Sequence, residues 1–197
     1  MNKKDWYDIA LKNYGDSNYS KALFAINKFL KQRPRDRYGN LLLGLIYGEL
    51  SNYKKSFRIL KKLQPTKSDN KIYKKLYFGR IGKNYESIGR HSLALKNYDK
   101  MIQLIPDETV GYIYKGACLA ALGEYPLAIQ EHLKATKKEG NPEEAFYNLA
   151  LIYRAEMKFE QAKIFCEKSL EIDPSDEQVK HCLKDILETL KLKKNRM

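Results

Sequence analysis

Histidine, cysteine and paired carboxylates, the side chains that most often carry out chemistry, are few in this chain of 197 residues and widely spaced. The histidines are His91, His132 and His181. Each falls inside an apolar, helix-like pattern, so we interpret all three as packing residues rather than general bases. Glu143 with Glu144, and Asp176 with Glu177, lie where helices are expected to begin and where the helix dipole favours negative charge. With no phosphate-loop, HExxH or GxSxG motif, the sequence predicts no enzyme, no catalytic residue and no cofactor.

The three cysteines are Cys118, Cys166 and Cys182, an odd number without CxxC spacing. Inside helical patterns, such cysteines are typical of buried thiols in a reducing compartment. A metal site is the alternative, because His181 adjoins Cys182 and Cys166 could lie near them after folding. Neighbours on a helix point in different directions, however, so we predict no metal site.

Positive charge is concentrated in the first half of the chain. The net charge is +13, and residues 1–100 hold 23 Lys and Arg against 8 Asp and Glu. Eight of these basic residues form a candidate basic patch: Lys54, Lys55, Arg58, Lys61, Lys62, Lys71, Lys74 and Lys75. Such a segment is typical either of a solvated helix face or of a surface that attracts an acidic partner. Tyr53, Tyr73 and Tyr77 are interleaved with it, which would permit stacking on nucleic-acid bases.

A fixed repeat explains how these residues are positioned. A small residue in one amphipathic segment is followed twelve positions later by a second small residue, five times along the chain. The first residues of the pairs are Ala10, Gly44, Gly82, Gly116 and Ala150. The second residues are Ala22, Ser56, Ala94, Ala128 and Ala162. Both series step by 34, 38, 34 and 34 residues, and this period predicts stacked copies of one supersecondary unit.

Each copy reads as a hairpin of two short helices. Apolar residues recur at helical spacing in both halves, and a proline such as Pro34, Pro106 or Pro174 follows the second half. Small residues allow the two helices to cross closely, while aromatic residues fill the flanking space.

This pattern resembles the tetratricopeptide repeat, most clearly in the fifth copy, AFYNLALIYRAEMKFEQAKIFCEKSLEIDPSDE. The resemblance implies an all-α, right-handed α-solenoid of helix-turn-helix repeats. It covers residues 1–174 in five copies, at about 5–36, 38–69, 70–108, 109–142 and 143–174. Residues 175–197 carry an apolar stripe and a basic end, and we expect them to form a capping helix and basic tail. The alternative is a free amphipathic arm.

The second copy departs from the pattern, because Pro65 comes early and four extra residues fall near TKSDN. A longer connection or an extended following helix would absorb them, with Ser68 or Asp69 as the expected N-cap.

In such stacks the first helix of each hairpin lines the concave side. These helices carry apolar residues outside the packing stripe, which are expected to form a partner-binding groove. The candidate groove residues are Tyr7, Leu11, Tyr14, Tyr38, Leu41, Leu45, Ile113, Tyr114, Tyr147 and Asn148. The alternative is that stacking of successive first helices consumes some of them as core.

The family resemblance also sets limits on the ligand. Some tetratricopeptide domains bind a terminal carboxylate through Lys and Asn, and others bind backbone through an Asn ladder. The matching positions here include Leu11, Arg80 and Tyr114, and only Asn148 remains of a ladder. A protein or peptide segment with apolar anchors therefore fits the groove better.

We expect a cytoplasmic scaffold or adaptor without a transmembrane segment or secretory signal. One alternative is binding of nucleic acid or an anionic surface by the basic half, with nucleic acid the less favoured of these ligands. Another is a dedicated chaperone for one client. The pattern makes no prediction of oligomeric state.

Overall fold

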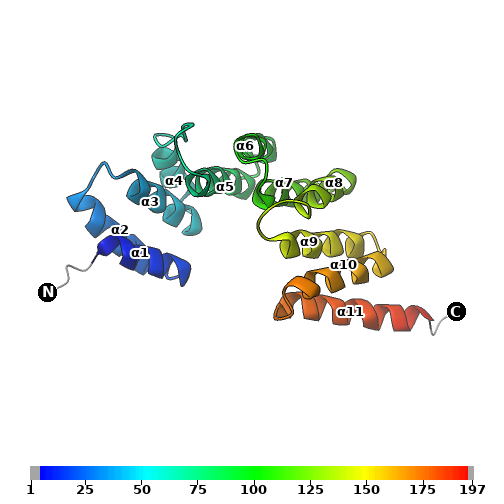
Figure 1. Cartoon of the computed structure of the whole chain (residues 1–197). Coiled ribbons are helices and arrows are strands. Elements are labelled where there is room, and N and C mark those ends of the chain that lie inside the picture. Colours follow the sequence, from blue (N-terminus) through cyan, green and yellow to red (C-terminus); the bar gives the residue numbers. More distant parts are fainter. Residues whose placement is uncertain (1–4, 195–197) are drawn as a thin grey trace. The chain divides into compact units, whose positions relative to one another are not determined.

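The computed structural model describes residues 5–194, which fold into eleven α-helices and contain no β-strand. They are α1 (Trp6–Gly15), α2 (Tyr19–Gln32), α3 (Arg37–Glu49), α4 (Tyr53–Leu60), α5 (Lys71–Ser87), α6 (His91–Leu104), α7 (Thr109–Ala121), α8 (Tyr125–Ala135), α9 (Pro142–Ala155), α10 (Phe159–Ile172) and α11 (Glu177–Lys194) (Figure 1). The predicted all-α class is confirmed. None of the helices in the described range is long and apolar enough to cross a membrane.

The two helices of every hairpin are joined by a three-residue turn of constant geometry. Its middle residue has a φ between 56° and 78° in all five hairpins. These residues are Ser17, Ser51, Gly89, Gly123 and Met157. Glycine adopts this left-handed conformation without a Cβ penalty, whereas serine and methionine do not. The column shares the 34, 38, 34, 34 spacing, but its mixed residue types hide it in the sequence.

The connections from one hairpin to the next vary in length. Three of them contain four residues, residues 136–141 form one of six, and residues 61–70 form one of ten. The ten-residue connection is held at its end by Asp69, which accepts a hydrogen bond from the Thr66 backbone and pairs with Arg37 at 2.8 Å. The expectation that Ser68 or Asp69 caps the next helix is therefore wrong.

The N-cap of α5 is Asn70, whose side chain accepts from the backbone N–H of Tyr73 at 2.8 Å. The four extra residues of the third copy are absorbed inside α5. Gly82 lies eleven residues after the start of α5, while Gly44 lies seven residues after the start of α3. An extended helix thus preserves the register of the small residues.

Close approach at the small residues holds each hairpin together. A Cβ added to Gly44 would lie 2.7 Å from Leu60 of the facing helix, and one added to Gly116 would lie 2.7 Å from the His132 ring. In the first and fifth hairpins both small residues are alanines, and all four side chains are fully buried. Ser56 uses its small side chain differently: its hydroxyl donates to the Gly44 carbonyl at 2.7 Å.

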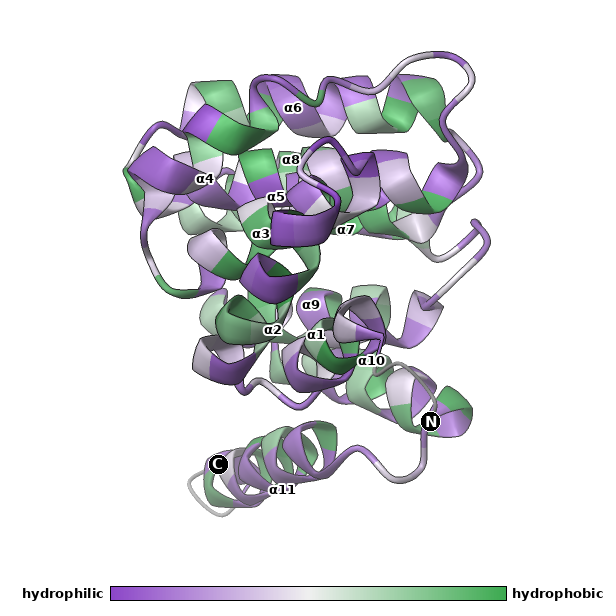
Figure 2. Ribbon diagram, turned by 90° about the vertical axis from the view of Figure 1, so that its left-hand side faces the viewer, coloured by the Kyte–Doolittle hydropathy of each residue, from purple (hydrophilic) through white to green (hydrophobic). Residues whose placement is uncertain are grey.

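The chain divides into two compact units, residues 1–97 and 98–197, with the division inside α6. In the first unit the first helices of successive hairpins, α1, α3 and α5, contact one another. In the second unit α7 contacts α9, and α11 packs on α10. Most helices carry both hydrophobic and hydrophilic residues in Figure 2, as expected for elements that bury one side.

The last helix docks through a continuous apolar stripe. Val179, Cys182 and Ile186 of α11 are buried in one cluster with Ala162 and Cys166 of α10. The alternative of an undocked arm is wrong for residues 177–194, because this stripe is already covered.

Two glycines provide a direct test of the close helix crossings. We expect Gly44→Ala to be less stable than Gly15→Ala by about 1–3 kcal/mol, because only the first substitution overpacks a crossing. A Cβ at Gly15 meets nothing within 4 Å, and the same gain in helix propensity applies to both. Urea unfolding of the two variants measures the difference. Equal stabilities would contradict the role given to Gly44.

Candidate functional site

A polar bridge joins the first three first helices of the chain. The Tyr14 hydroxyl of α1 donates to Glu49 Oε1 of α3 at 3.2 Å, and the Arg80 guanidinium of α5 forms an ion pair with the same oxygen. Arg80 also donates to the Tyr14 hydroxyl oxygen at 3.4 Å. The Arg80 side chain is only 10% exposed and lies against Gly48, where any Cβ would overlap it. The bridge therefore requires Gly48 as well as its three polar members.

Burial raises the pKa of Tyr14, and Glu49 adds to this increase while Arg80 opposes it. The phenol therefore stays protonated at neutral pH and remains a donor to Glu49. Each bridge member thus keeps the protonation state that the hydrogen bonds require.

The bridge identifies which side of these helices faces the same way. Leu11 precedes Tyr14 by three residues, Leu76 precedes Arg80 by four, and Tyr38 precedes Glu49 by eleven. All three spacings bring residues to one side of an α-helix. Leu11, Tyr38 and Leu76 are 43%, 44% and 41% exposed. We call this surface the first-helix face of unit one, consisting of Tyr7, Leu11, Tyr14, Tyr38, Glu49, Leu76 and Arg80.

Three predicted groove residues do not lie on an accessible surface. Leu41, Leu45 and Ile113 are only 2–3% exposed. Adjacent first helices pack directly on each other, so side chains between them become core. For these three residues the groove prediction is wrong, and the alternative of consumption by stacking is correct.

The second unit keeps half-exposed polar and aromatic groups on its first helices. Tyr114 of α7 and Tyr147 and Asn148 of α9 are each partly exposed. The Tyr114 ring contacts Tyr98 at a centroid distance of 5.6 Å, and Leu151 of α9 is also half-buried. Binding by these residues stays a prediction.

Most of the candidate basic patch lies on the surface of the first unit. Six of its members are exposed: Lys54, Lys55, Arg58, Lys61, Lys62 and Lys71. Lys75 is half-buried, whereas Lys74 is buried and its ammonium donates to the Lys67 carbonyl at 3.3 Å. The assignment of Lys74 to an exposed patch is therefore wrong.

The tyrosines proposed to stack on nucleic-acid bases are not accessible either. Tyr73 is 0% exposed and Tyr77 is 4% exposed. Burial raises the pKa of Tyr77 to about 12. Tyr53 is half-buried and directs its hydroxyl to Ser51 at 3.3 Å. The patch thus consists of charges without exposed stacking rings among these residues.

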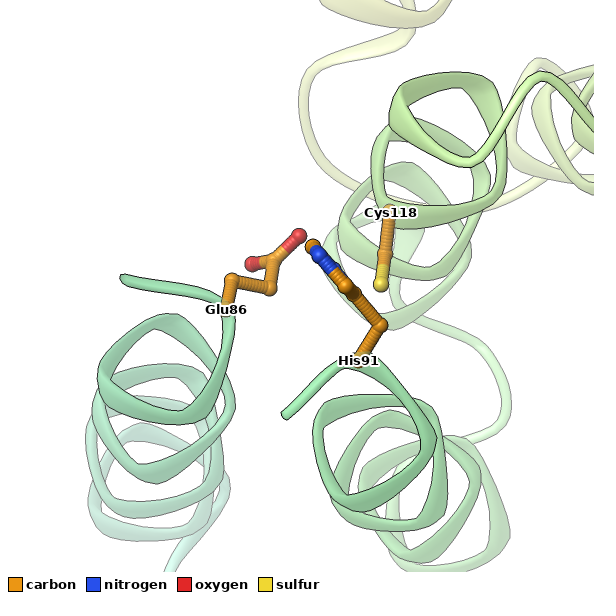
Figure 3. Close-up of side chains that lie close together, drawn as sticks. All are labelled: Glu86, His91 and Cys118. Atoms are coloured by element: carbon orange, nitrogen blue, oxygen red, sulfur yellow. The ribbon is translucent and has the colours of Figure 1, made fainter. Parts of the chain in front are cut away.

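The histidines occupy three different environments. His132 is fully buried against Gly116, and neither of its ring nitrogens has a hydrogen-bond partner. His91 begins α6, and Figure 3 shows its ring beside the carboxylate of Glu86 at the end of α5. His181 is exposed and lies 3.4 Å from Asp185.

The cysteines are packing residues in the described structure. All three are free and buried, as predicted, including Cys118 on α7, which Figure 3 also labels. Burial raises the pKa of Cys166 to about 12, so its thiol stays protonated. Because Cys182 faces the core and His181 faces solvent, the two neighbours do not combine with Cys166 as ligands of one metal.

Comparison with known proteins gives the same repeat unit. The model of the tetratricopeptide repeat family matches residues 143–176. The chain is 32% identical over 114 residues to the TPR repeat-containing protein MJ1428 of Methanocaldococcus jannaschii, covering 58% of this chain and 19% of the relative. It is 25% identical to protein O-mannosyl-transferase TMTC3 of Mus musculus over 77% of this chain and 18% of the relative. The chain thus spans about a fifth of the length of these curated relatives.

Solved structures share the fold along nearly the whole chain. TTC0263, a TPR protein of Thermus thermophilus, superposes with a TM-score of 0.77 at 19% identity, covering 93% of this chain and 98% of that one. The chain is a tetratricopeptide repeat protein. A second repeat protein, YrrB, superposes with a TM-score of 0.57 at 20% identity over 91% of this chain and 90% of that one. The predicted α-solenoid fold class is confirmed by these neighbours.

In this tetratricopeptide repeat protein, sequence patterns missed three members of the first-helix face of unit one. Glu49, Leu76 and Arg80 were outside the predicted groove set. Leu76 stands 38 residues after Tyr38, the same interval as Gly44 to Gly82, and this register would have found it. Glu49 and Arg80 are 31 residues apart and out of register, so no repeat signal pairs them.

The buried His132 predicts a specific loss of stability in acid. Burial lowers the pKa of His132 to about 4, with Glu131 opposing the decrease. Below about pH 6.5 the unfolded chain binds a proton that the native state rejects, so native stability falls between pH 6.5 and 4. At pH 5 the expected loss is about 2 kcal/mol. His132→Leu should lack this component.

Urea unfolding of both proteins at pH 7.5, 6 and 5 measures it, with each protein referred to its own value at pH 7.5. Parallel stability curves for wild type and His132→Leu would contradict the assignment.

Proposed function

We propose that this protein is an interaction scaffold that binds a segment of a partner protein on its first helices. The observation that carries the proposal is the first-helix face of unit one. Three apolar or aromatic side chains there, Leu11, Tyr38 and Leu76, each leave about two fifths of their surface exposed on adjacent helices. Exposed apolar side chains gathered on one face are typical of a protein-interaction surface.

The polar bridge gives this face a fixed framework. Tyr14, Glu49 and Arg80 tie α1, α3 and α5 to one another beside the exposed apolar groups. A surface that is already rigid loses less conformational entropy when it binds a partner. Apolar anchors of the partner would pack on Leu11, Tyr38 and Leu76, and Tyr7 and Tyr14 would border the contact.

The second unit would contribute Tyr114, Tyr147 and Asn148. Tyrosine supplies a large contact area with few rotatable bonds, and asparagine can pair with peptide backbone. The solved structure of YrrB is described as having an unusual peptide-binding site, which supports a peptide ligand for this chain as well. The role is recognition rather than turnover, and an adaptor and a dedicated chaperone would differ only in the segment bound.

Selection from a random linear peptide library on the full chain tests the proposal. Peptides with apolar anchors should be enriched, and Leu11→Ala/Leu76→Ala should weaken their binding by about tenfold or more, as expected for the loss of two central contacts. Tyr147→Ala should weaken binding of any peptide long enough to reach the second unit. Fluorescence anisotropy measures the affinities.

Leu127→Ala/Leu133→Ala is the matched control, because these leucines are 47% and 41% exposed on the second helix α8. Circular dichroism melting verifies that all variants are folded. Peptides that bind Leu11→Ala/Leu76→Ala as tightly as wild type would refute the assigned face.

A second candidate function is binding of an anionic ligand by the basic patch. The observation that favours it is the exposure of six of the eight basic side chains in one unit. Burial of Tyr73 and Tyr77 argues against base stacking, so this binding would be mainly electrostatic.

Salt dependence separates the two candidates. If the patch binds an anionic polymer, affinity for single-stranded oligonucleotide should fall by about one decade or more between 50 and 200 mM salt. Lys54→Glu/Lys61→Glu/Lys62→Glu should abolish that binding while leaving the affinity for selected apolar peptides unchanged. Oligonucleotide affinity that responds to neither salt nor these substitutions would exclude the patch.

A further inference from the structure

Two adjacent hollows run along one side of the α10–α11 pair. The larger has a volume of about 650 Å³ and lies between the start of α10 and the end of α11. The smaller, of about 360 Å³, lies between the end of α10 and the middle of α11. Leu187 and Lys191 line both hollows, so they form one continuous surface, which we call the α10–α11 groove. The groove is on the last helices of the chain and involves no member of the first-helix face of unit one.

The floor of the groove is apolar. Phe159 and Leu190 are half-buried at the larger hollow, and Leu170 and Leu183 are half-buried at the smaller one. Leu187, which lines both, is 38% exposed. The buried stripe of α11 points elsewhere, to the cluster containing Ala162 and Cys166. These floor residues are therefore apolar groups left over after α11 has docked.

The rim of the groove is strongly basic. Seven lysines and only two glutamates, Glu160 and Glu188, line the two hollows. The second half of the chain, residues 101–197, is slightly acidic, with 14 Lys and Arg against 16 Asp and Glu. The excess of lysine at the groove therefore does not reflect the local composition.

Several rim charges are available for an external partner. Among the described residues, no ion pair involves Lys184, Lys191 or Lys194, although each is exposed. Lys193 lies over the Phe159 ring, 4.5 Å from its centroid. An acidic ligand would find unpaired ammonium groups beside an apolar floor, which is a complementary arrangement for an amphipathic segment.

The repeat register indicates which occupant the groove does not suit. Lys184 lies 34 residues after Ala150, in the column where the five hairpins have Ala or Gly. That column is where the second helix of a hairpin crosses the first closely. A lysine there blocks the close crossing, and covering its ammonium with an apolar helix would cost desolvation energy. A further repeat of the ordinary kind is thus disfavoured, while a segment that places a carboxylate at this point is favoured.

We propose that the α10–α11 groove binds an acidic amphipathic helix of a partner protein. Apolar side chains of that helix pack on Phe159, Leu183, Leu187 and Leu190, and flanking carboxylates pair with Lys184 and Lys191. The lining residues of α11 extend from Lys180 to Lys194, a length of about 21 Å at 1.5 Å per residue. A partner helix of about 14 residues matches this length.

The test uses two synthetic helical peptides of 14 residues and the full chain. The acidic peptide carries leucines at helical spacing with glutamates at the flanking positions, and the basic peptide has lysine in place of every glutamate. We expect the acidic peptide to bind saturably by fluorescence anisotropy and the basic peptide to bind at least tenfold more weakly. Lys184→Glu/Lys191→Glu should reduce acidic-peptide affinity at least tenfold.

The matched control is Lys100→Glu/Lys137→Glu, which makes the same change in charge at exposed residues outside the groove. It should bind the acidic peptide nearly as tightly as wild type. Leu187→Ala should also weaken binding, which separates groove contact from general charge attraction. Circular dichroism melting checks that each variant is folded.

Three outcomes would overturn the proposal: no saturable binding of the acidic peptide, equal losses in the groove and control variants, or equal affinity for both peptides. Self-association is measured by sedimentation velocity. A dimer disrupted by Lys184→Glu/Lys191→Glu would also overturn it, because the occupant would then be a second copy. The outcome is independent of the first-helix face, whose variant Leu11→Ala/Leu76→Ala should bind the acidic peptide normally.

Discussion

The close crossing of two helices at a small residue is the constraint on which this structure depends. Where Gly44 meets Leu60, or Gly116 meets His132, a single added carbon would already be too near its neighbour. This contact fixes the side on which each second helix packs, and therefore which side of the first helix remains for adjacent hairpins and for partners. The polar bridge of Tyr14, Glu49 and Arg80 forms on that remaining side. Packing inside the hairpins thus places the proposed binding surface.

The sequence was sufficient for the repeat unit and insufficient for the surface. Small residues at constant spacing predicted the helices and their hairpins because that pattern is set by local packing. The burial of Leu41, Leu45 and Ile113 depends instead on how closely neighbouring first helices approach, which no single helix pattern records. The same limit applies to Lys74, whose stem is covered although its residue type favours exposure. Contacts out of register, such as Glu49 with Arg80, are visible only in the folded chain.

Charge gives a similar lesson at the two ends of the chain. The basic patch of the first half was evident because its lysines are close in sequence. The basic rim of the α10–α11 groove was hidden, since Lys158 and Lys163 of α10 join lysines of α11 only after the two helices pair. Net charge therefore identified one candidate surface and gave no sign of the other. An apolar floor next to the charges distinguishes the second surface from the first.

The constant turns and variable connections described above make each hairpin an interchangeable module. Every hairpin closes with the same three-residue turn and the same left-handed middle residue, so its internal geometry tolerates no change in length. Connections of four, six and ten residues show that length varies between modules instead. Duplication or exchange of whole hairpins can thus diversify such a chain without disturbing its cores. The ten-residue connection at 61–70, pinned by Arg37 and Asp69, illustrates how such an insertion is accommodated.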